Sequence, residues 1–224
     1  MSDRADRVSA LEAYHRAEVV DCVRCPLSQG RTQVVVGNGD PGADLMFVGE
    51  APGYHEDVQG IPFVGASGKL LSQMLEGIGL TREDVFVANV LKCRPPGNRD
   101  PQPAEIRECE PHLFTQVSLI RPRMICTLGN FATKLLSGRP EGISRVHGCE
   151  LPMEIGGLQV LLYPLYHPAA ALYTRSMLST LEGDFARIPE LLRSVIPGRD
   201  GVDDAPAPAP AAVAAAADEQ LGLF

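Results

Sequence analysis

The feature that most constrains the fold is an apolar run that leads through a glycine-rich loop into a helix start. Residues 45–48 have the apolar character of a buried strand, and residues 67–75 have the pattern of a helix start. Strand, glycine-rich loop and helix, in that order, is where an α/β sheet places a ligand. A loop that cradles phosphate carries a lysine after its glycines and few acids. This loop contains Glu50, Glu56 and the aromatic Phe63 instead, which favours a planar, uncharged ligand and a positioned water.

The rest of the chain repeats the alternation of apolar strands and amphipathic helices. Strands are predicted at residues 34–36, 45–48, 85–90, 124–128 and 160–165, with 151–155 and 160–165 as a possible hairpin. Helices are predicted at residues 7–20, 69–77, 103–120, 131–136 and 178–195. This order predicts an α/β fold with a mostly parallel sheet covered on both faces.

Composition divides the chain into one folded domain, residues 1–198, and a tail. Residues 199–217 are dominated by Ala, Pro and Asp, and we expect a disordered linker there. Five acidic residues and no basic ones fall within residues 200–224, so the rest of the chain carries −3 of the net charge of −8. A value that close to zero neither supports nor excludes DNA binding.

Cysteine usage points to a ligand site. We see no membrane span and no signal peptide, so we expect an intracellular, reducing location in which cysteines are ligands or core residues. Two cysteines in a Cys-x-x-Cys pair and two later ones form a four-thiolate set suited to zinc or to an iron–sulfur cluster: Cys22, Cys25, Cys93 and Cys109. Four buried cysteines without a metal are the alternative.

Three further segments stand in a fixed order with these cysteines. They are Gly49-Glu-Ala-Pro-Gly with Pro62-Phe-Val-Gly65, then Val87-Ala-Asn-Val-Leu-Lys-Cys93-Arg-Pro-Pro, then Tyr166-His-Pro-Ala-Ala-Ala-Leu172. Together the motifs closely resemble family 4 of the uracil-DNA glycosylase superfamily, over roughly residues 10–196. The resemblance implies an α/β/α sandwich around a four-stranded parallel sheet, with the site at the carboxyl ends of the strands. It also implies a structural 4Fe-4S cluster on the four cysteines, with zinc as the alternative.

The resemblance implies a pocket for an extruded base. An enzyme that acts on a base hidden in the DNA stack must flip it out. Phe63 would stack on uracil, and the Asn89 amide would donate to O4 and accept from N3–H. Cytosine presents the opposite donor and acceptor pattern, so unpaired polar groups would reject it.

The same resemblance implies the catalytic groups. His167 would stabilise the negative charge that develops at uracil O2, and backbone N–H groups at the turn of Glu50 and Ala51 would add to this. Glu50 would hold or deprotonate the attacking water, although other families of the superfamily place Asp or Asn where this chain has Ala51. Glu56 and Asn98 match family positions and are secondary candidates.

The segment after the histidine would contact DNA. Leu172 or Tyr173 would fill the gap left by the flipped base, and Arg175 would contact a phosphate. A covalent uracil-binding branch of the superfamily has a reactive histidine shortly after the asparagine strand. Residues 92–100 contain none, so turnover is expected here.

The last seven residues, 218–224, resemble the peptide by which bacterial repair proteins dock on the β sliding clamp. Leu221, Leu223 and Phe224 would fill an apolar groove, and Gln220 would bond at its edge. The linker before them would reach roughly 60 Å at about 3.1 Å per residue. A tail that folds back on the domain is the alternative.

These patterns predict a monofunctional uracil-DNA glycosylase that leaves an abasic site, with no metal in the chemistry. We expect a monomer in the cytoplasm, associated with the nucleoid. The alternatives are a non-catalytic, clamp-tethered DNA-binding module with a structural metal site and a zinc-stapled hydrolase of a small nucleoside. We assign no functional role to the four remaining histidines, His15, His55, His112 and His147.

Overall fold

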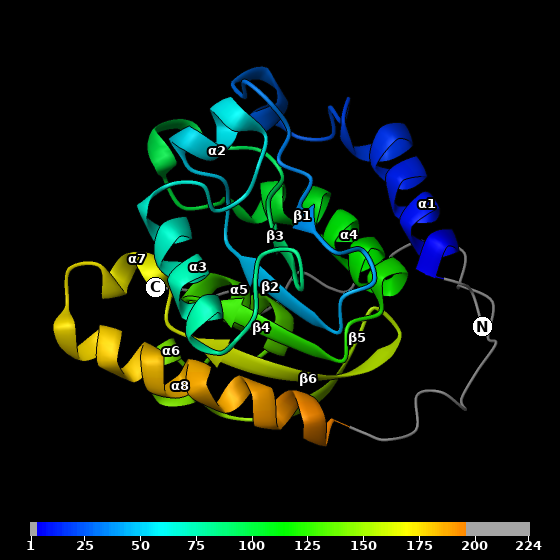
Figure 1. Ribbon diagram of the computed structural model, residues 1–224. Coiled ribbons are helices and arrows are strands. Elements are labelled where there is room, and N and C mark those ends of the chain that lie inside the picture. Colours follow the sequence, from blue (N-terminus) through cyan, green and yellow to red (C-terminus); the bar gives the residue numbers. More distant parts are fainter. Residues whose placement is uncertain (1–3, 196–224) are drawn as a thin grey trace.

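A single six-stranded sheet forms the centre of the molecule. The structure is a computed structural model that describes residues 4–195. The strands lie in the order β1-β3-β2-β4-β6-β5 (Figure 1). Their bounds are β1 Asn38–Gly39, β2 Leu45–Gly49, β3 Phe86–Asn89, β4 Met124–Leu128, β5 Leu151–Ile155 and β6 Leu158–Leu165.

Four of the six strands form the predicted parallel core. β2 pairs in parallel with both β3 and β4, and β4 pairs in parallel with β6. The two edge strands, β1 and β5, are antiparallel to their neighbours and extend the sheet beyond the expected four strands. β5 and β6 form the hairpin that the sequence suggested, because Gly156 and Gly157 both take the positive φ that a tight turn between them requires.

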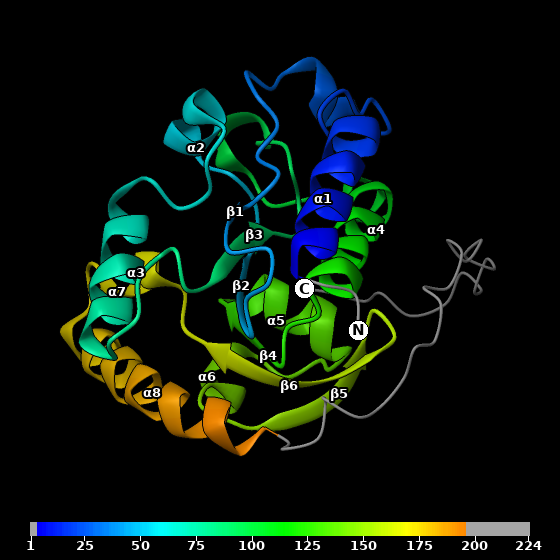
Figure 2. The same ribbon diagram turned by 45° about the vertical axis from the view of Figure 1, so that its right-hand side comes forward.

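Helices cover both faces of the sheet, as the sequence predicted. Figure 2 shows α1 (Arg4–Tyr14) beside α4 (Pro103–Ile120) on one side of the sheet, and α5 (Asn130–Ser137) packs into the same core. The opposite core is formed by α3 (Ala66–Gly77), α7 (Pro168–Ala171) and α8 (Arg175–Ser194). The result is an α/β/α sandwich.

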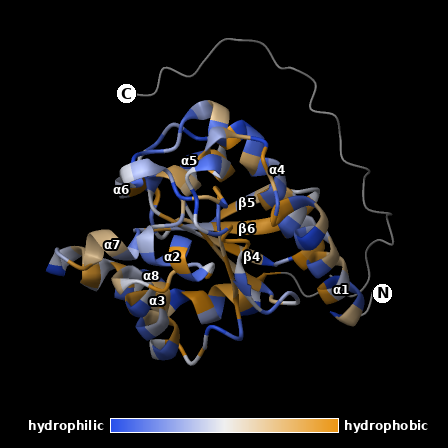
Figure 3. Ribbon diagram, turned by 90° about the horizontal axis from the view of Figure 1, so that it is seen from above, coloured by the Kyte–Doolittle hydropathy of each residue, from blue (hydrophilic) through white to orange (hydrophobic). Residues whose placement is uncertain are grey.

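The strands between the two cores are mostly apolar because both of their faces are buried. Every residue of β2 and β4 is buried. Within β2, Met46 and Val48 face the α1/α4 core, whereas Leu45 and Phe47 face the α3/α8 core. The hydrophobic colour of the strands in Figure 3 follows this burial. Each fully buried side chain of this kind contributes roughly 1.5–3 kcal/mol, so the paired cores fix the sheet.

Two local predictions were wrong. Residues 34–36 form no strand: Val35 donates its N–H to the Lys92 carbonyl, and pairing with β3 begins only at Asn38, after Gly37 has turned the chain with a φ of 130°. The predicted loop after β2 contains a short helix, α2 (Tyr54–Gln59), which ends at Gly60 in the left-handed conformation. Glycines at both ends of so short a helix conceal its periodicity.

The remaining short elements are α6 (Ile143–Val146), a π-helical turn at His15–Val19, and 3₁₀ turns at Pro26–Gln29 and Pro96–Asn98. None of the helices within residues 4–195 has the length and apolarity needed to cross a membrane. The expected linker, 199–217, and the expected clamp peptide, 218–224, lie outside the described residues.

Candidate active site and cysteine cavity

The carboxyl ends of β2 and β3 meet at one edge of the sheet. Gly49 and Asn89 are partners in the parallel register. The pairing continues past both strands, because Val90 donates its N–H to the Gly49 carbonyl at 2.9 Å and Leu91 donates to the Glu50 carbonyl at 3.0 Å. The backbone therefore holds Glu50 close to the end of the asparagine strand.

Asn89 is the most unusual residue at this edge. Its side chain is only 2% exposed, and its Oδ1 is buried without a hydrogen-bond partner among the described residues. A Cβ atom on Gly49 would collide with that Oδ1 and would lie 2.7 Å from Cζ of Phe63. Gly49 thus leaves the space in which the asparagine amide and the phenylalanine ring approach each other.

Phe63 is held in a strained conformation. Its φ is 55°, in the left-handed region that non-glycine residues seldom occupy, and such a residue costs on the order of 1–3 kcal/mol. The following turn is fixed by buried Glu56, whose Oε1 accepts the N–H groups of Val64 at 3.0 Å and Gly65 at 3.1 Å. The Glu56 carboxylate therefore holds the loop that carries Phe63.

His167 lies against the Phe63 ring. The two ring centroids are 5.6 Å apart and the planes are inclined by 28°. His167 caps the start of α7, where its Nδ1 accepts the N–H of Ala169 at 3.1 Å. Burial lowers the pKa of His167 to about 4, so the ring is neutral near pH 7. Because Nδ1 accepts, the single ring proton is on Nε2, which can donate to a ligand.

Glu50 is a half-buried carboxylate that directly follows β2. Burial, and secondly the charge of Asp100, raise the pKa of Glu50 above the ordinary glutamate value. Ala51 follows Glu50 and is half-buried. Asn98 is exposed, and its Oδ1 accepts from Nε of Arg94 at 2.7 Å. The Asn98 side chain is therefore bonded to Arg94.

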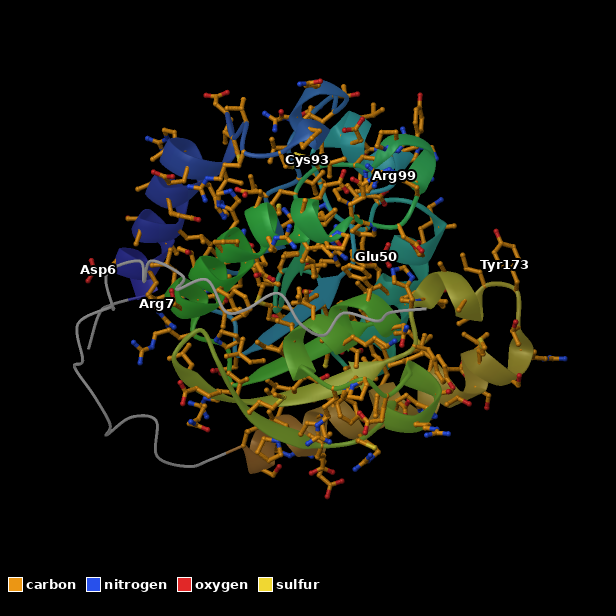
Figure 4. The ribbon with its side chains drawn as sticks, turned by 180° about the vertical axis from the view of Figure 1, so that it is seen from behind. Asp6, Arg7, Glu50, Cys93, Arg99 and Tyr173 are labelled. Atoms are coloured by element: carbon orange, nitrogen blue, oxygen red, sulfur yellow. The ribbon has the colours of Figure 1, made fainter. Side chains whose placement is uncertain are left out.

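The turn between α7 and α8 presents apolar side chains to solvent. Leu172 is 39% exposed and Tyr173 is 90% exposed. Figure 4 shows Tyr173 projecting from the periphery of the molecule, beyond Glu50. Arg175, also exposed, is the first residue of α8. Exposed apolar residues at a turn that follows the pocket histidine are in the position that the sequence predicted for a DNA wedge.

The structure brings all four predicted ligand cysteines together. One cavity is lined by Cys22, Cys25, Cys93 and Cys109, and also by the cationic Arg24, Arg31 and Lys92 and by His112. The first two cysteines precede the 3₁₀ turn Pro26–Gln29, the third follows β3, and the fourth lies on α4. The cavity therefore joins three segments that are far apart in the sequence.

The cavity carries hydrogen-bond donors for its sulfurs. Nη1 of Arg31 donates to Sγ of Cys93 at 3.4 Å, and the backbone N–H of Lys92 donates to Sγ of Cys109 at 3.2 Å. Burial raises the pKa of the Cys109 thiol to about 11 and also raises the pKa values of Cys25 and Cys93. Within residues 4–195, no group of three or more His, Cys, Asp or Glu side chains is arranged to hold a single metal ion. The sulfurs line the cavity without converging on one point.

Lys92 connects the asparagine strand to the cysteine cavity. The sequence analysis gave this residue no role. Its side chain is 1% exposed, and its Nζ donates to the Asn89 carbonyl at 2.7 Å and to Oε1 of Gln116 at 2.5 Å. Burial lowers the pKa of Lys92 to about 8, against the opposing effect of the cysteines. A lysine beside a buried strand carries no sequence signal of such a role, because most lysines are exposed.

Comparison with known proteins agrees with this arrangement. Residues 36–190 match the family model described as the uracil DNA glycosylase superfamily. A type-4 uracil-DNA glycosylase of Sulfurisphaera tokodaii is 46% identical over 193 residues, covering 84% of this chain and 87% of that protein. Type-4 uracil-DNA glycosylases of Saccharolobus solfataricus and Archaeoglobus fulgidus are 46% and 47% identical, covering 79% and 78% of this chain and 84% and 89% of those proteins.

The family-model match covers most of the fold, with Phe63, Asn89 and His167 and the two later cysteines, Cys93 and Cys109. These three relatives are all named type-4, whereas type-5 uracil-DNA glycosylases of Thermus thermophilus and Pyrobaculum aerophilum are 31% and 30% identical over 57% and 67% of this chain. The chain therefore belongs to the uracil DNA glycosylase superfamily and, within it, to the type-4 uracil-DNA glycosylases.

Proposed function

We propose that this protein is a uracil-DNA glycosylase that flips uracil out of DNA and hydrolyses its N-glycosidic bond, leaving an abasic site for base excision repair. Membership of the type-4 family supports the activity. The observation that carries the assignment of the site is the meeting of Asn89, Phe63 and His167 at the carboxyl end of the sheet, because an amide, a ring face and a donor imidazole are what a uracil ring requires.

Asn89 would recognise the base. Its buried Oδ1 has no partner among the described residues, and an orphaned acceptor at that depth costs about 1–3 kcal/mol unless a ligand satisfies it. Uracil N3–H is such a ligand donor, and the Nδ2 group would then donate to O4. The Lys92 ammonium donates to the backbone carbonyl of Asn89, which would hold the end of the strand that carries the amide.

His167 would stabilise the departing base. As the glycosidic bond breaks, negative charge develops on uracil and positive charge on the sugar. The neutral His167 ring would donate from Nε2 to O2, and backbone N–H groups near Ala51 would add to this. One preorganised donor of this kind lowers the barrier by about 2.7–4 kcal/mol.

Glu50 would hold the attacking water. Its backbone is fixed by pairing with Leu91, and its half-buried carboxylate has a raised pKa, which makes it a better proton acceptor than an exposed glutamate. The exposed Leu172 and Tyr173 would enter the gap left by the flipped nucleotide, and Arg175 would contact a phosphate.

The four cysteines would hold a structural 4Fe-4S cluster. The shared cavity and the two N–H donors to sulfur fit a thiolate-bound cluster. A tetrahedral zinc ion, with Zn–S bonds of about 2.3 Å, needs sulfurs within roughly 3.8 Å of one another, and the thiols do not converge in that way. A cluster there would staple residues 22–25 and α4 to the segment that carries Asn89.

Two further predictions, on the clamp peptide and on the location of the protein, extend this proposal. Gln220, Leu221, Leu223 and Phe224 would dock on the β sliding clamp through the preceding linker, which would keep a monomeric enzyme near DNA by effective concentration. The protein would act in the cytoplasm, at the nucleoid. Removal of residues 218–224 should then abolish clamp binding and leave uracil removal from short oligonucleotides unchanged.

The test of the activity is abasic-site formation on oligonucleotides that contain one uracil. The parent protein should produce abasic sites with turnover, and Asn89→Ala should lower kcat/KM by about 10²–10³-fold because base recognition is lost. Asn38→Ala is the matched control and should change kcat/KM less than about threefold, since that side chain is exposed on the edge strand β1. A parent protein that leaves uracil in place would contradict the assignment.

A further inference from the structure

His112 lies in the wall of the cysteine cavity and has one ring nitrogen without a partner. The side chain is 0% exposed. It is one turn after Cys109 on α4 and lines the same cavity as the four thiols. Its Nε2 is buried and makes no hydrogen bond in the part of the chain that the structure describes. A buried ring nitrogen that lacks a partner costs on the order of 1–3 kcal/mol, so the unpaired atom calls for an explanation.

The second ring nitrogen of His112 identifies the missing group as an acceptor. Nδ1 lies 2.7 Å from the Tyr14 hydroxyl. When the hydroxyl donates to Nδ1, the ring proton is on Nε2 and the orphaned atom is an N–H donor. The opposite tautomer would aim a lone pair toward a cavity whose other donors, on Arg24, Arg31 and Lys92, leave it unpaired. The donor tautomer complements thiolate sulfurs, which supply only acceptors. The carboxylate in the cavity wall, on Glu108, does not bond Nε2 either.

We propose that His112 donates a hydrogen bond from Nε2 to a sulfur of the cluster, as a positioning residue that raises the reduction potential of the cluster. The inference rests on the proposed 4Fe-4S cofactor. Hydrogen bonds to cluster sulfurs stabilise the more electron-rich state and so set the potential. Tyr14, on the N-terminal helix α1, fixes the donor tautomer, which links that helix to the electronic state of the cluster.

The test is the midpoint potential of the loaded, full-length protein, measured by spectroelectrochemistry through the visible absorbance of the cluster. His112→Phe keeps a planar ring and removes the donor. Its potential should fall by about 28–59 mV, which corresponds to a threefold to tenfold change in the one-electron equilibrium. His112→Gln places an amide N–H near the original Nε2 and should restore at least half of the shift.

The matched control is His15→Gln, which alters a histidine that bonds Gln116 and is not among the residues lining the cavity. Its potential should stay at the parent value. Tyr14→Phe removes the hydroxyl that fixes the His112 tautomer and changes no residue that lines the cavity. The potential of this variant should fall less than that of His112→Phe. If neither His112 variant retains iron, Tyr14→Phe decides: a lowered potential supports the proposal and an unchanged one overturns it.

Two failures are distinguishable. A parent protein purified without iron or visible absorbance contradicts the cofactor, and this inference with it, while uracil removal is scored separately. A loaded parent whose potential is unchanged in His112→Phe overturns the role of His112 alone.

Discussion

The strand-end pocket and the cysteine cavity are built in different ways on either side of one short segment. The pocket is formed at the ends of β2 and β3, where a nearby carboxylate holds the Phe63 loop and His167, distant in the sequence, lies against the Phe63 ring. The cavity is assembled from a turn near residue 25, the segment after β3 and the middle of α4. Residues 89–93 join the two regions, since Asn89 belongs to the pocket and Lys92 and Cys93 line the cavity.

The difference shows that the fold places the pocket side chains with one region and holds its irregular segments together with another. The pocket depends on backbone pairing and on one strained residue, so its side chains are placed to within the tolerance of a rigid sheet. The cavity has little regular structure around it, so the thiols would supply the anchorage that secondary structure does not. Changes in the cavity should act mainly on stability, and changes in the pocket mainly on rate.

The largest expected effect is on stability. Cys109→Ser should remove a cluster ligand and lower the free energy of unfolding by about 4 kcal/mol or more, as loss of a metal site does. The measurement is guanidinium unfolding under anaerobic conditions. Cys149→Ser, at an exposed free thiol, is the control and should stay within about 0.5 kcal/mol. Equal unfolding midpoints for the two variants would show that the cavity anchors nothing.

The next effect is on rate. His167→Ala should lower the single-turnover rate on uracil-containing DNA by about 10²–10³-fold, because the donor to O2 is lost. Because His167 also caps α7, the free energy of unfolding should fall by about 0.5–2 kcal/mol, less than in Cys109→Ser. His167→Gln keeps an N–H in a similar position and should recover part of the rate. An alanine variant as fast as the parent would remove His167 from the chemistry.

Lys92→Met should affect both regions, though each less strongly. The substitution leaves the Asn89 carbonyl and Oε1 of Gln116 without their donor, which should cost roughly 1–3 kcal/mol of stability. It should also lower kcat/KM by about tenfold, because the Asn89 backbone loses its restraint. Lys134→Met on α5 is the control. A change in only one of the two measurements would show that residues 89–93 do not couple the regions.

The smallest effect concerns pH. Burial raises the pKa of Glu50 above the ordinary glutamate value, and the carboxylate is the active form, so kcat/KM should fall as pH drops through that raised pKa. In Glu50→Gln this limb should disappear, and the residual rate should stay flat down to the region near pH 4 in which His167 protonates. The measurement is a single-turnover pH profile from about pH 4 to about pH 8. An acid limb that persists in Glu50→Gln would exclude Glu50 as its source.

Elements that are buried on both faces could be predicted from the sequence. β4 and α4 have the expected bounds, since a continuous apolar run and a proline at the first helical turn are local signals. The edge strand β1 could not, because it is two residues long and its position depends on Gly37 and on pairing with β3. Helix α2 was concealed by its flanking glycines.

The residues of the candidate site could be predicted from motifs, but their positions relative to one another could not. The meeting of Phe63 with His167 depends on a left-handed backbone and on a crossover through β4 and β6, neither of which has a local signature. The roles of these residues stay predictions. Lys92 and His112 were missed because their function follows from what surrounds them, and a buried lysine and a buried histidine look like any others in a sequence.

The order of the cysteines along the chain bears on how the protein is made. The last of them, Cys109, emerges from the ribosome before β4, β6 and His167 do. A cofactor held by these thiols could therefore be inserted into a nascent chain whose emerged part still lacks half of the parallel strands of the sheet. Cofactor delivery would then precede the assembly of the pocket around His167.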